Sequence, residues 1–339
     1  MAVSLESLLA DREWLLADGA TGTTLFAMGL ESGEAPELWN ESAPEKVRAL
    51  YDGAIGAGSD LFLTNSFGGN ASRLKLHDAD GRVFELNRAA AEIGRAAADA
   101  AEAAGGRPVV VAGSIGPTGE IMAPLGPLSI EAAADMFEEQ ARGLLAGGVD
   151  VLWVETMSAP DELRAAALGI ARTGAPWCGT MSFDTAGRTM MGLTAADMVA
   201  LVDGLEHKPL AFGANCGVGA SDLLRTVLGF ESVHPALPVV AKGNAGIPKF
   251  VDGHIHYDGT PELMADYAVL ARDCGARIIG GCCGTTPAHL VAMRAALEAT
   301  PKGPVPDLET ISKRLGGFSS ASDGSGGAPA GRERRRRRA

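Results

Sequence analysis

The sequence predicts a single-domain (β/α)8 barrel of the TIM type, and three observations support this fold. Short apolar, β-branched runs recur roughly every 30 to 40 residues along the chain. Stretches with the length and periodicity of helices lie between them. Aromatic residues make up only 5% of the 339 residues, whereas glycine occurs 45 times, which suits an aliphatic core joined by many tight loops. Alternating strands and helices indicate a parallel sheet closed into a barrel. The alternative is an open doubly wound sheet, but no strand here leads into G-x-G-x-x-G.

Each predicted strand is short, apolar and bounded by Gly or Pro, as expected for a parallel strand buried on both faces. The eight predicted strands are Trp14–Asp18, Leu61–Asn65, Val109–Gly113, Val151–Glu155, Trp177–Ser182, Ala211–Asn215, Val239–Gly243 and Arg277–Gly281. The eight predicted helices are Pro44–Gly58, Asp80–Ala104, Ser129–Gly147, Pro160–Thr173, Thr194–Glu206, Gly219–Ser232, Thr260–Cys274 and Pro287–Ala299. A Thr-Pro pair marks the start of the last two, with Thr260 and Thr286 as N-caps and Pro261 and Pro287 at the first helical position.

Four connections are longer than ordinary βα loops and follow the first, second, third and seventh strands. Because βα loops lie at the C-terminal end of a barrel, we expect them to cover its mouth. They are Thr24–Ala43, Ser66–Ala79, Ser114–Leu128 and Asn244–Gly259. We place the barrel at residues 1–300 and interpret residues 301–339 as a linker and an Arg-rich disordered tail. The segment Phe318–Gly331 is rich in Ser, Gly and Ala, which is typical of a disordered linker.

Charge and cysteine content limit the function classes. The chain carries a net charge of −13 although its last nine residues contribute six Arg and one Glu. A body this acidic argues against nucleic acid as a partner. The N-terminus lacks the features of a signal peptide, and no apolar run approaches the roughly 20 residues that cross a bilayer. The five cysteines are an odd number, so they cannot all pair in disulfides. Together, these features predict a cytoplasmic protein without a membrane partner. An oligomer is possible.

Three of the five cysteines stand at strand ends framed by glycine. Cys282 and Cys283 follow the last strand in a Gly-Gly-Cys-Cys-Gly run, and Cys216 follows the sixth. In a regular strand adjacent side chains face opposite ways, so both can reach one metal only where the strand breaks. Three thiolates on one metal leave a position open, which is typical of a catalytic Zn²⁺ site. The alternatives are small buried hydrophobic residues or an adjacent-cysteine disulfide. Cys178 and Cys274 lack this frame, and we expect them to be buried spectators.

Polar residues end other strands at the same predicted depth. Asp18 and Glu155 are two carboxylates that can capture an ammonium group or act as general acid and base. Alternatively, Asp18 caps the turn that follows it and Glu155 pairs with a loop arginine. Lys242 is either a carboxylate anchor or part of an ion pair inside the barrel.

Backbone and amide groups complete the predicted mouth. Gly19 and Ala20 offer N–H donors that can hold a carboxylate. Asn65 and Asn215 can orient a substrate or close the vacant position of the metal, with structural roles in turns as the alternative.

With these segments in this order, the chain resembles the homocysteine S-methyltransferase family from about Leu15 to Leu297. The resemblance rests on Asp18–Thr23, Thr64–Phe67, Val154–Thr156, Gly213–Gly217 and Gly280–Gly284. It implies a zinc enzyme in which a zinc-bound homocysteine thiolate attacks a donor methyl group and forms methionine. It also implies that Cys216, Cys282 and Cys283 are the zinc ligands, that Asp18 and Glu155 bind the amino-acid end of L-homocysteine, and that Gly19 and Ala20 supply adjoining backbone contacts.

The resemblance leaves the methyl donor open. Betaine-using relatives carry a Tyr after the Glu of the fourth strand and a Phe-Tyr pair after the second, which suits cation–π contact with a quaternary ammonium. Here Thr156 and Phe67-Gly68 hold those positions. The Glu155-Thr156 pair and the Asn65–Phe67 run look closer to the homocysteine module of cobalamin-dependent methionine synthase, although Trp39, Phe67 and Tyr51 can build another cage. We therefore expect betaine or another onium donor, or a methylated corrinoid on a separate protein. The alternative function is a non-catalytic zinc- or thiol-binding sensor on the same barrel.

Overall fold

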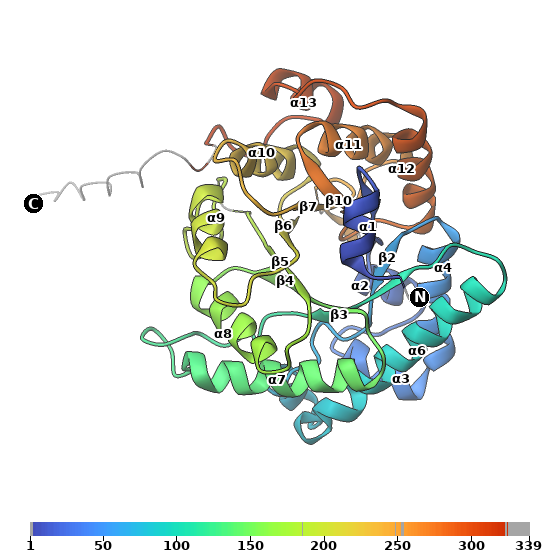
Figure 1. Cartoon of the computed structure of the whole chain (residues 1–339), viewed down its shortest axis with the longest axis vertical. Coiled ribbons are helices and arrows are strands. Elements are labelled where there is room, and N and C mark those ends of the chain that lie inside the picture. The colour runs from blue at the N-terminus through green and yellow to red at the C-terminus, as the bar shows by residue number, and fades with distance from the viewer. Residues whose placement is uncertain (1–2, 185, 248, 252–253, 323, 325–339) are drawn as a thin grey trace, which may run out of the picture.

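The computed structural model describes residues 3–184, 186–247, 249–251, 254–322 and 324, and it confirms the predicted barrel. Eight parallel strands form one sheet that curls around a central axis, with helices outside it (Figure 1). Their order in the sheet is β1-β10-β7-β6-β5-β4-β3-β2. The strands are β1 (Leu15–Leu16), β2 (Leu61–Leu63), β3 (Val110–Ile115), β4 (Val151–Met157), β5 (Trp177–Met181), β6 (Ala211–Cys216), β7 (Val239–Gly243) and β10 (Ala276–Gly281).

Two aspartates join the first and second strands, where the barrel closes. The Asp60 N–H donates to Leu16 O over 2.7 Å, and the Asp60 carboxylate accepts the N–H of Leu16 at 2.9 Å. The Asp18 carboxylate accepts the N–H of Leu63 at 2.8 Å. Side-chain oxygens thus take the place of ladder carbonyls, which explains why β1 is shorter than the predicted strand.

Alternation along the strands divides the core into two layers. One set of side chains fills the barrel interior and includes Leu15, Leu61, Val110 and Trp153. The other set packs outward against the helices. The N-terminal helix α1 (Leu5–Asp11) joins the interior layer through Leu5 and Leu8, which were not part of the sequence prediction. Burial on both faces accounts for the continuous apolar runs.

The helices lie between strands as predicted. They are α4 (Pro44–Gly56), α6 (Val83–Ala103), α7 (Ile130–Ala146), α8 (Pro160–Ala171), α9 (Ala195–Asp203), α10 (Ala220–Glu231), α11 (Pro261–Asp273) and α12 (Pro287–Ala299). The side chain of Thr260 accepts the N–H of Leu263, so it is the N-cap that the sequence predicted for α11. None of the helices in the described ranges is both long and apolar enough to cross a membrane.

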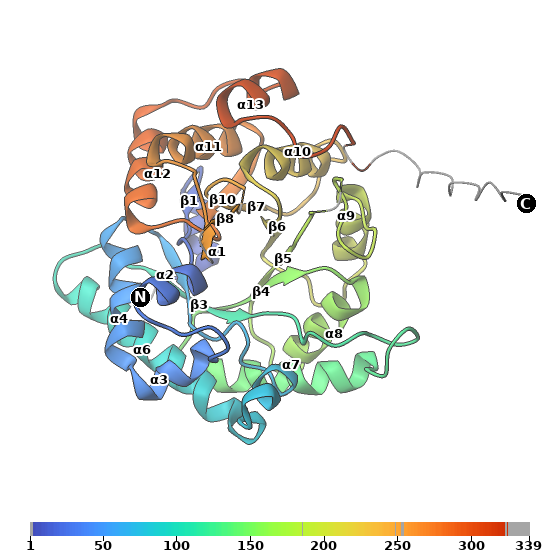
Figure 2. The same ribbon diagram turned by 180° about the vertical axis from the view of Figure 1, so that it is seen from behind.

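The long connections contain short elements that the sequence pattern did not reveal. After β1 come α2 (Gly22–Ala27), η1 (Pro36–Leu38) and α3 (Trp39–Ser42); after β2 come α5 (Ala71–Leu74), η2 (Lys75–His77) and η3 (Asp80–Arg82). After β7, the antiparallel pair β8 (Lys249–Val251) and β9 (His254–His256) lies on the face seen in Figure 2. These pieces are too short to show a periodicity of their own.

Part of the segment interpreted as a linker is attached to the barrel. Helix α13 (Leu308–Leu315) buries Ile311 and packs against α10 and α11. Beyond it, the Phe318 ring lies 4.6 Å from the guanidinium of Arg225. Arg225 also donates to Asp222 at 2.6 Å and to the Ser320 carbonyl at 2.7 Å. Of residues 301–339, predicted to be a linker and an Arg-rich disordered tail, residues 323 and 325–339 lie outside the described residues.

Arg225 should be the main link between this C-terminal segment and the barrel. Its ion pair with Asp222 is buried, with side chains 6% and 8% exposed. We predict that Arg225→Ala lowers the free energy of unfolding by about 3 kcal/mol, because Asp222 is left buried without its cation. Urea unfolding measures this loss. Arg314→Ala, which removes an exposed pair with Asp266, is the control and should cost under about 1 kcal/mol. Equal losses in the two variants would contradict the prediction.

Candidate functional site

A turn directly after β10 brings the two adjacent cysteines to one side. Cys282 still pairs with β7, donating its N–H to Gly243 O at 2.7 Å, and the chain then turns through a Thr285 N–H bond to Cys282 O. Gly284 lies in this turn with φ of +78°, a conformation that favours glycine. A Cβ on Gly281 would lie 2.2 Å from Thr285 Cγ2, so only glycine fits there. The strand break expected from the glycine frame is therefore present.

The three predicted cysteines come together. Their sulfur atoms lie within 4.8 Å of one another, and Cys216 Sγ is 3.9 Å from Cys283 Sγ. Sulfur ligands about 2.3 Å from a tetrahedral zinc stand about 3.8 Å apart, so the spacing fits this metal. By contrast, Cys178 and Cys274 are buried apart from the cluster, as predicted.

The pKa values of all three clustered thiols are raised. A hydrogen bond with Cys282 raises the pKa of Cys216 to about 12, and one with Cys216 raises the pKa of Cys283 to about 11. Burial and the charge of the neighbouring thiols add to both shifts. Three adjacent thiolates therefore need a cation to exist at neutral pH. This donor set fits a soft divalent metal such as zinc.

Asn244 holds the two cysteine-bearing segments together. Its amide N–H2 donates to Gly217 O at 2.8 Å, and its Oδ1 accepts the N–H of Cys283 at 3.0 Å. Its side chain is 1% exposed, so both bonds are shielded from water. Asn244 directly follows the predicted seventh strand, but the sequence assigned it no role. A strand-end position could have suggested it, whereas its partners follow only from the fold.

A buried lysine separates the two predicted carboxylates. Lys242 Nζ lies 2.6 Å from Asp18 Oδ1, with side chains 3% and 8% exposed. Burial alone would lower the pKa of Lys242, but Asp18 and Glu155 outweigh it and raise that pKa. The interpretation as an ion pair inside the barrel is therefore confirmed. Lys242 also lines the larger cavity described below, so its role as a carboxylate anchor stays a prediction. Asp18 pairs with Lys242 and Leu63.

Glu155 is held by Ser114 on the neighbouring strand. The Ser114 hydroxyl donates to Glu155 Oε1 at 2.5 Å. Burial raises the pKa of Glu155, while Lys242 and Ser114 act in the opposite direction. The alternative partner considered from sequence was a loop arginine, but the hydrogen-bond partner is Ser114. Ser114 was not among the predicted site residues, although it lies near the end of β3 as the other polar residues lie at their strand ends.

The two predicted asparagines are engaged by the protein itself. Asn65 donates from its side chain to Pro36 O at 2.7 Å and to Asn40 Oδ1 at 3.0 Å, which ties the first long connection to β2. Asn215 binds Thr156 and Thr180 through Oδ1 and donates to Thr156 Oγ1 at 2.7 Å. Its Nδ2 lies 3.9 Å from Cys282 Sγ. Of these contacts, the one with Cys282 brings Asn215 beside the cysteine cluster.

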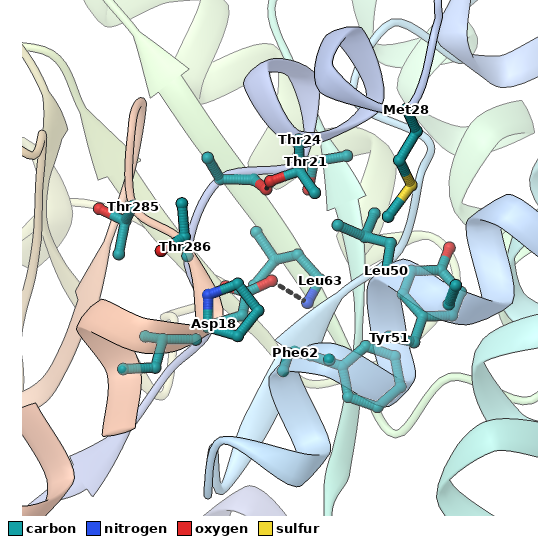
Figure 3. A pocket seen from close by; sticks show the side chains of 17 residues that line it. Asp18, Thr21, Thr24, Met28, Leu50, Tyr51, Phe62, Leu63, Thr285 and Thr286 are labelled. Carbon is teal, nitrogen blue, oxygen red and sulfur yellow. Dashed lines mark hydrogen bonds between the residues drawn. The ribbon is translucent and has the colours of Figure 1, made fainter. Parts of the chain in front are cut away.

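Two cavities meet along the backbone after β1. The larger, about 390 Å³, is lined by all three cysteines and by Glu155 and Lys242. The smaller, about 50 Å³, is lined by Asp18, which accepts the dashed hydrogen bond from Leu63 in Figure 3. Gly19 and Ala20 line both cavities. The smaller volume holds about one or two waters, so only the larger can take an organic ligand.

The backbone after β1 is fixed by the turn after β10. Ala20 donates its N–H to Thr285 O at 3.0 Å, so this donor is already used within the protein. A Cβ on Gly19 would lie 2.6 Å from the same carbonyl. The Gly19–Ala20 segment thus forms a close-packed wall beside the cysteines.

Comparison with known proteins agrees with this geometry. A family model described as homocysteine S-methyltransferase matches residues 15–297. A methionine synthase of Mycobacterium tuberculosis is 31% identical over 296 residues, which cover 84% of this chain and 24% of the relative. A methionine synthase of Mycobacterium leprae is 31% identical over 307 residues, 86% of this chain and 25% of the relative. The chain thus spans about a quarter of the length of these curated relatives.

A solved structure covers the same barrel from end to end. The metallated form of the homocysteine methyltransferase MmuM from Escherichia coli superimposes with a TM-score of 0.71 and 28% sequence identity. The match covers 86% of this chain and 99% of that one. An oxidized form of the same protein gives a TM-score of 0.72.

The buried charges at the mouth should depend strongly on one another. We predict that Lys242→Met costs about 3 to 5 kcal/mol of unfolding free energy, because Asp18 is left without its cation. The double variant Asp18→Asn/Lys242→Met should be more stable than Lys242→Met, since Asn keeps an oxygen for the Leu63 N–H without the charge. Urea unfolding of the single and double variants tests this. Lys208→Met, which loses one exposed bond to Asp203 O, is the control. The prediction would be refuted if the double variant lost as much unfolding free energy as Asp18→Asn and Lys242→Met lose in sum.

Proposed function

Because the chain belongs to the homocysteine S-methyltransferase family, we propose that it is a zinc-dependent enzyme that methylates L-homocysteine to methionine. The single observation that carries the proposal is the convergence of three cysteine thiols with Glu155 and Lys242 on one cavity. Thiols alone would suit a structural metal, and charged groups alone would suit many ligands. Together they fit a small amino acid that carries its own thiol.

Cys216, Cys282 and Cys283 would hold the zinc ion. Their mutual distances support this assignment, as does the metallated form of the Escherichia coli relative. When bound, zinc lowers the pKa of a thiol at its open position, which leaves that sulfur nucleophilic at neutral pH. The cysteines thus have a catalytic as well as a metal-binding role in this proposal.

The remaining residues would orient the amino-acid end of the substrate. Glu155 lines the larger cavity and would accept hydrogen bonds from a substrate ammonium group. Lys242 lines the cavity and would attract the substrate carboxylate, while Asp18 lies behind it and fixes its charge. Gly19 and Ala20 would form the adjoining wall.

Asn65 and Asn215 would act by holding that cavity in shape. The amide N–H2 of Asn65 ties down the first long connection. The amide of Asn215 is occupied by two threonines. Both are therefore proposed to support substrate binding from within the cavity wall.

The donor side of the cavity favours a methyl group carried by a separate corrinoid protein over betaine. Of the three aromatic residues considered for a cage, Phe67 lines the large cavity. Trp39 is buried with Lys46 Nζ 4.2 Å from its ring, and Tyr51 lines the smaller cavity. Thr156 offers no aromatic face. Betaine and other onium donors are the alternatives that the assay must compare.

We predict that the purified protein contains about one zinc per chain and forms methionine from homocysteine. Betaine, S-methylmethionine and methylcobalamin should be supplied in turn, with methylcobalamin standing in for the corrinoid protein. Cys282→Ala should lose zinc and activity, because only two thiols remain. Cys178→Ala, a buried cysteine outside the cluster, should keep both.

Metal analysis and methionine assays distinguish the outcomes. A zinc-free wild type together with full activity of Cys282→Ala would refute the proposal. Binding of zinc and homocysteine without turnover of any donor would favour the sensor alternative.

A further inference from the structure

Two residues at the mouth adopt a backbone conformation that is uncommon outside glycine. Thr156, which follows Glu155 at the end of β4, has φ of +63°, and Cys216 at the end of β6 has φ of +61°. Such a conformation is unfavourable for a β-branched residue such as Thr, and it persists only when surrounding contacts hold it. Surrounding contacts must therefore stabilise both strand ends. The end of β4 carries Glu155, proposed to bind the substrate, and the end of β6 carries Cys216, proposed to bind the metal.

An irregularity at the end of β4 leaves the N–H of Thr156 without a partner in the strand ladder. Pairing with β5 shifts register between Val154 and Met157, so Glu155 and Thr156 stand outside the regular ladder. The N–H of Thr156 donates instead to Asn215 Oδ1 at 2.9 Å. Because an unsatisfied N–H at this depth would cost free energy, this bond compensates for the missing ladder contact.

Asn215 connects three strands through one fully buried side chain. Its Oδ1 also accepts the hydroxyl of Thr180 on β5 at 2.7 Å, and its Nδ2 donates to Thr156 Oγ1 at 2.7 Å. Asn215 and Thr180 are both 0% exposed. Asn215 directly precedes Cys216 in the chain, so movement of its amide would also move the left-handed residue that carries the thiol.

We propose that Thr180, Asn215 and Thr156 form a positioning network that fixes the Cys216 thiol relative to the Glu155 carboxylate. A ligand that reaches both ends of the cavity is sensitive to this separation. The inference rests on the proposed function, in which homocysteine is that ligand. Thr180 acts only through Asn215, so it is a positioning residue and its hydroxyl should affect binding without touching the ligand.

Removal of the Thr180 hydroxyl tests this directly. Thr180→Val keeps the shape of the side chain and suits a strand, but it leaves Asn215 Oδ1 with one donor instead of two. We expect zinc-loaded Thr180→Val to bind homocysteine about tenfold more weakly by calorimetry, with zinc content unchanged. Thr180→Ser restores the hydroxyl and should bind within about twofold of wild type. A purely structural threonine would lower stability and leave the homocysteine Kd unchanged, which would overturn the proposal.

A second substitution separates the network from a direct contact. Thr156→Ala keeps the N–H bond to Asn215 but loses the bond to Thr156 Oγ1. If both threonines act through Asn215, the double variant Thr180→Val/Thr156→Ala should bind no more weakly than about the worse single variant. Multiplying losses would mean independent contacts and would overturn the network. If Thr180→Val folds poorly, the single variant Thr156→Ala tests the network alone, with weaker homocysteine binding expected and an unchanged Kd contradicting it.

Amide hydrogen exchange gives a readout that does not depend on homocysteine. The Thr156 N–H should exchange faster in Thr180→Val than in wild type, with Thr180→Ser restoring protection. Failure of wild type to bind homocysteine would refute the proposed function alone, and the exchange rates would still decide the network. Unchanged Thr156 exchange in Thr180→Val would overturn the network even if wild type binds homocysteine.

Discussion

The Asp18 carboxylate is the group on which both the barrel and its mouth depend. One oxygen accepts the Leu63 N–H across the junction of β1 and β2, and the other pairs with Lys242 of β7. A single buried side chain thus joins the first two strands of the sheet to a strand on the far side of the junction. Because a buried carboxylate is tolerated only when it is paired, Lys242 is required by the fold and simultaneously places a positive charge at the cavity.

The cysteine cluster poses the complementary electrostatic problem. Asp18 has its cation within the protein, whereas the three clustered thiols have raised pKa values and need a cation to ionise together. The proposed zinc ion would supply this cation and leave one position for a fourth sulfur. The mouth then contains two charged groups: the Asp18–Lys242 pair beside Glu155, and the cysteine cluster with its metal. The proposed substrate has an amino-acid end that suits the charged side chains and a thiol that suits the metal. Asn215 and Asn244 hold the segments that carry these groups.

The sequence was sufficient for the barrel and for the cysteine cluster, but not for the partners of the polar residues. Cys216, Cys282 and Cys283 could be predicted because strand ends converge in a barrel and the glycine frame signals a break. Lys242 could be placed at the mouth, yet its choice of Asp18 as partner depends on the register between distant strands. Ser114 and Thr180 look like ordinary strand residues in sequence. Their roles appear only when Glu155 and Asn215 are seen beside them.

Zinc K-edge X-ray absorption, with and without L-homocysteine, tests the central claim most directly. The account predicts three sulfur ligands in the zinc-loaded protein and four after homocysteine is added, because the substrate thiol takes the open position. The same titration on Cys216→Ala should begin from fewer sulfurs. A sulfur count of three that does not change at saturating homocysteine would contradict the claim that the substrate sulfur binds the metal.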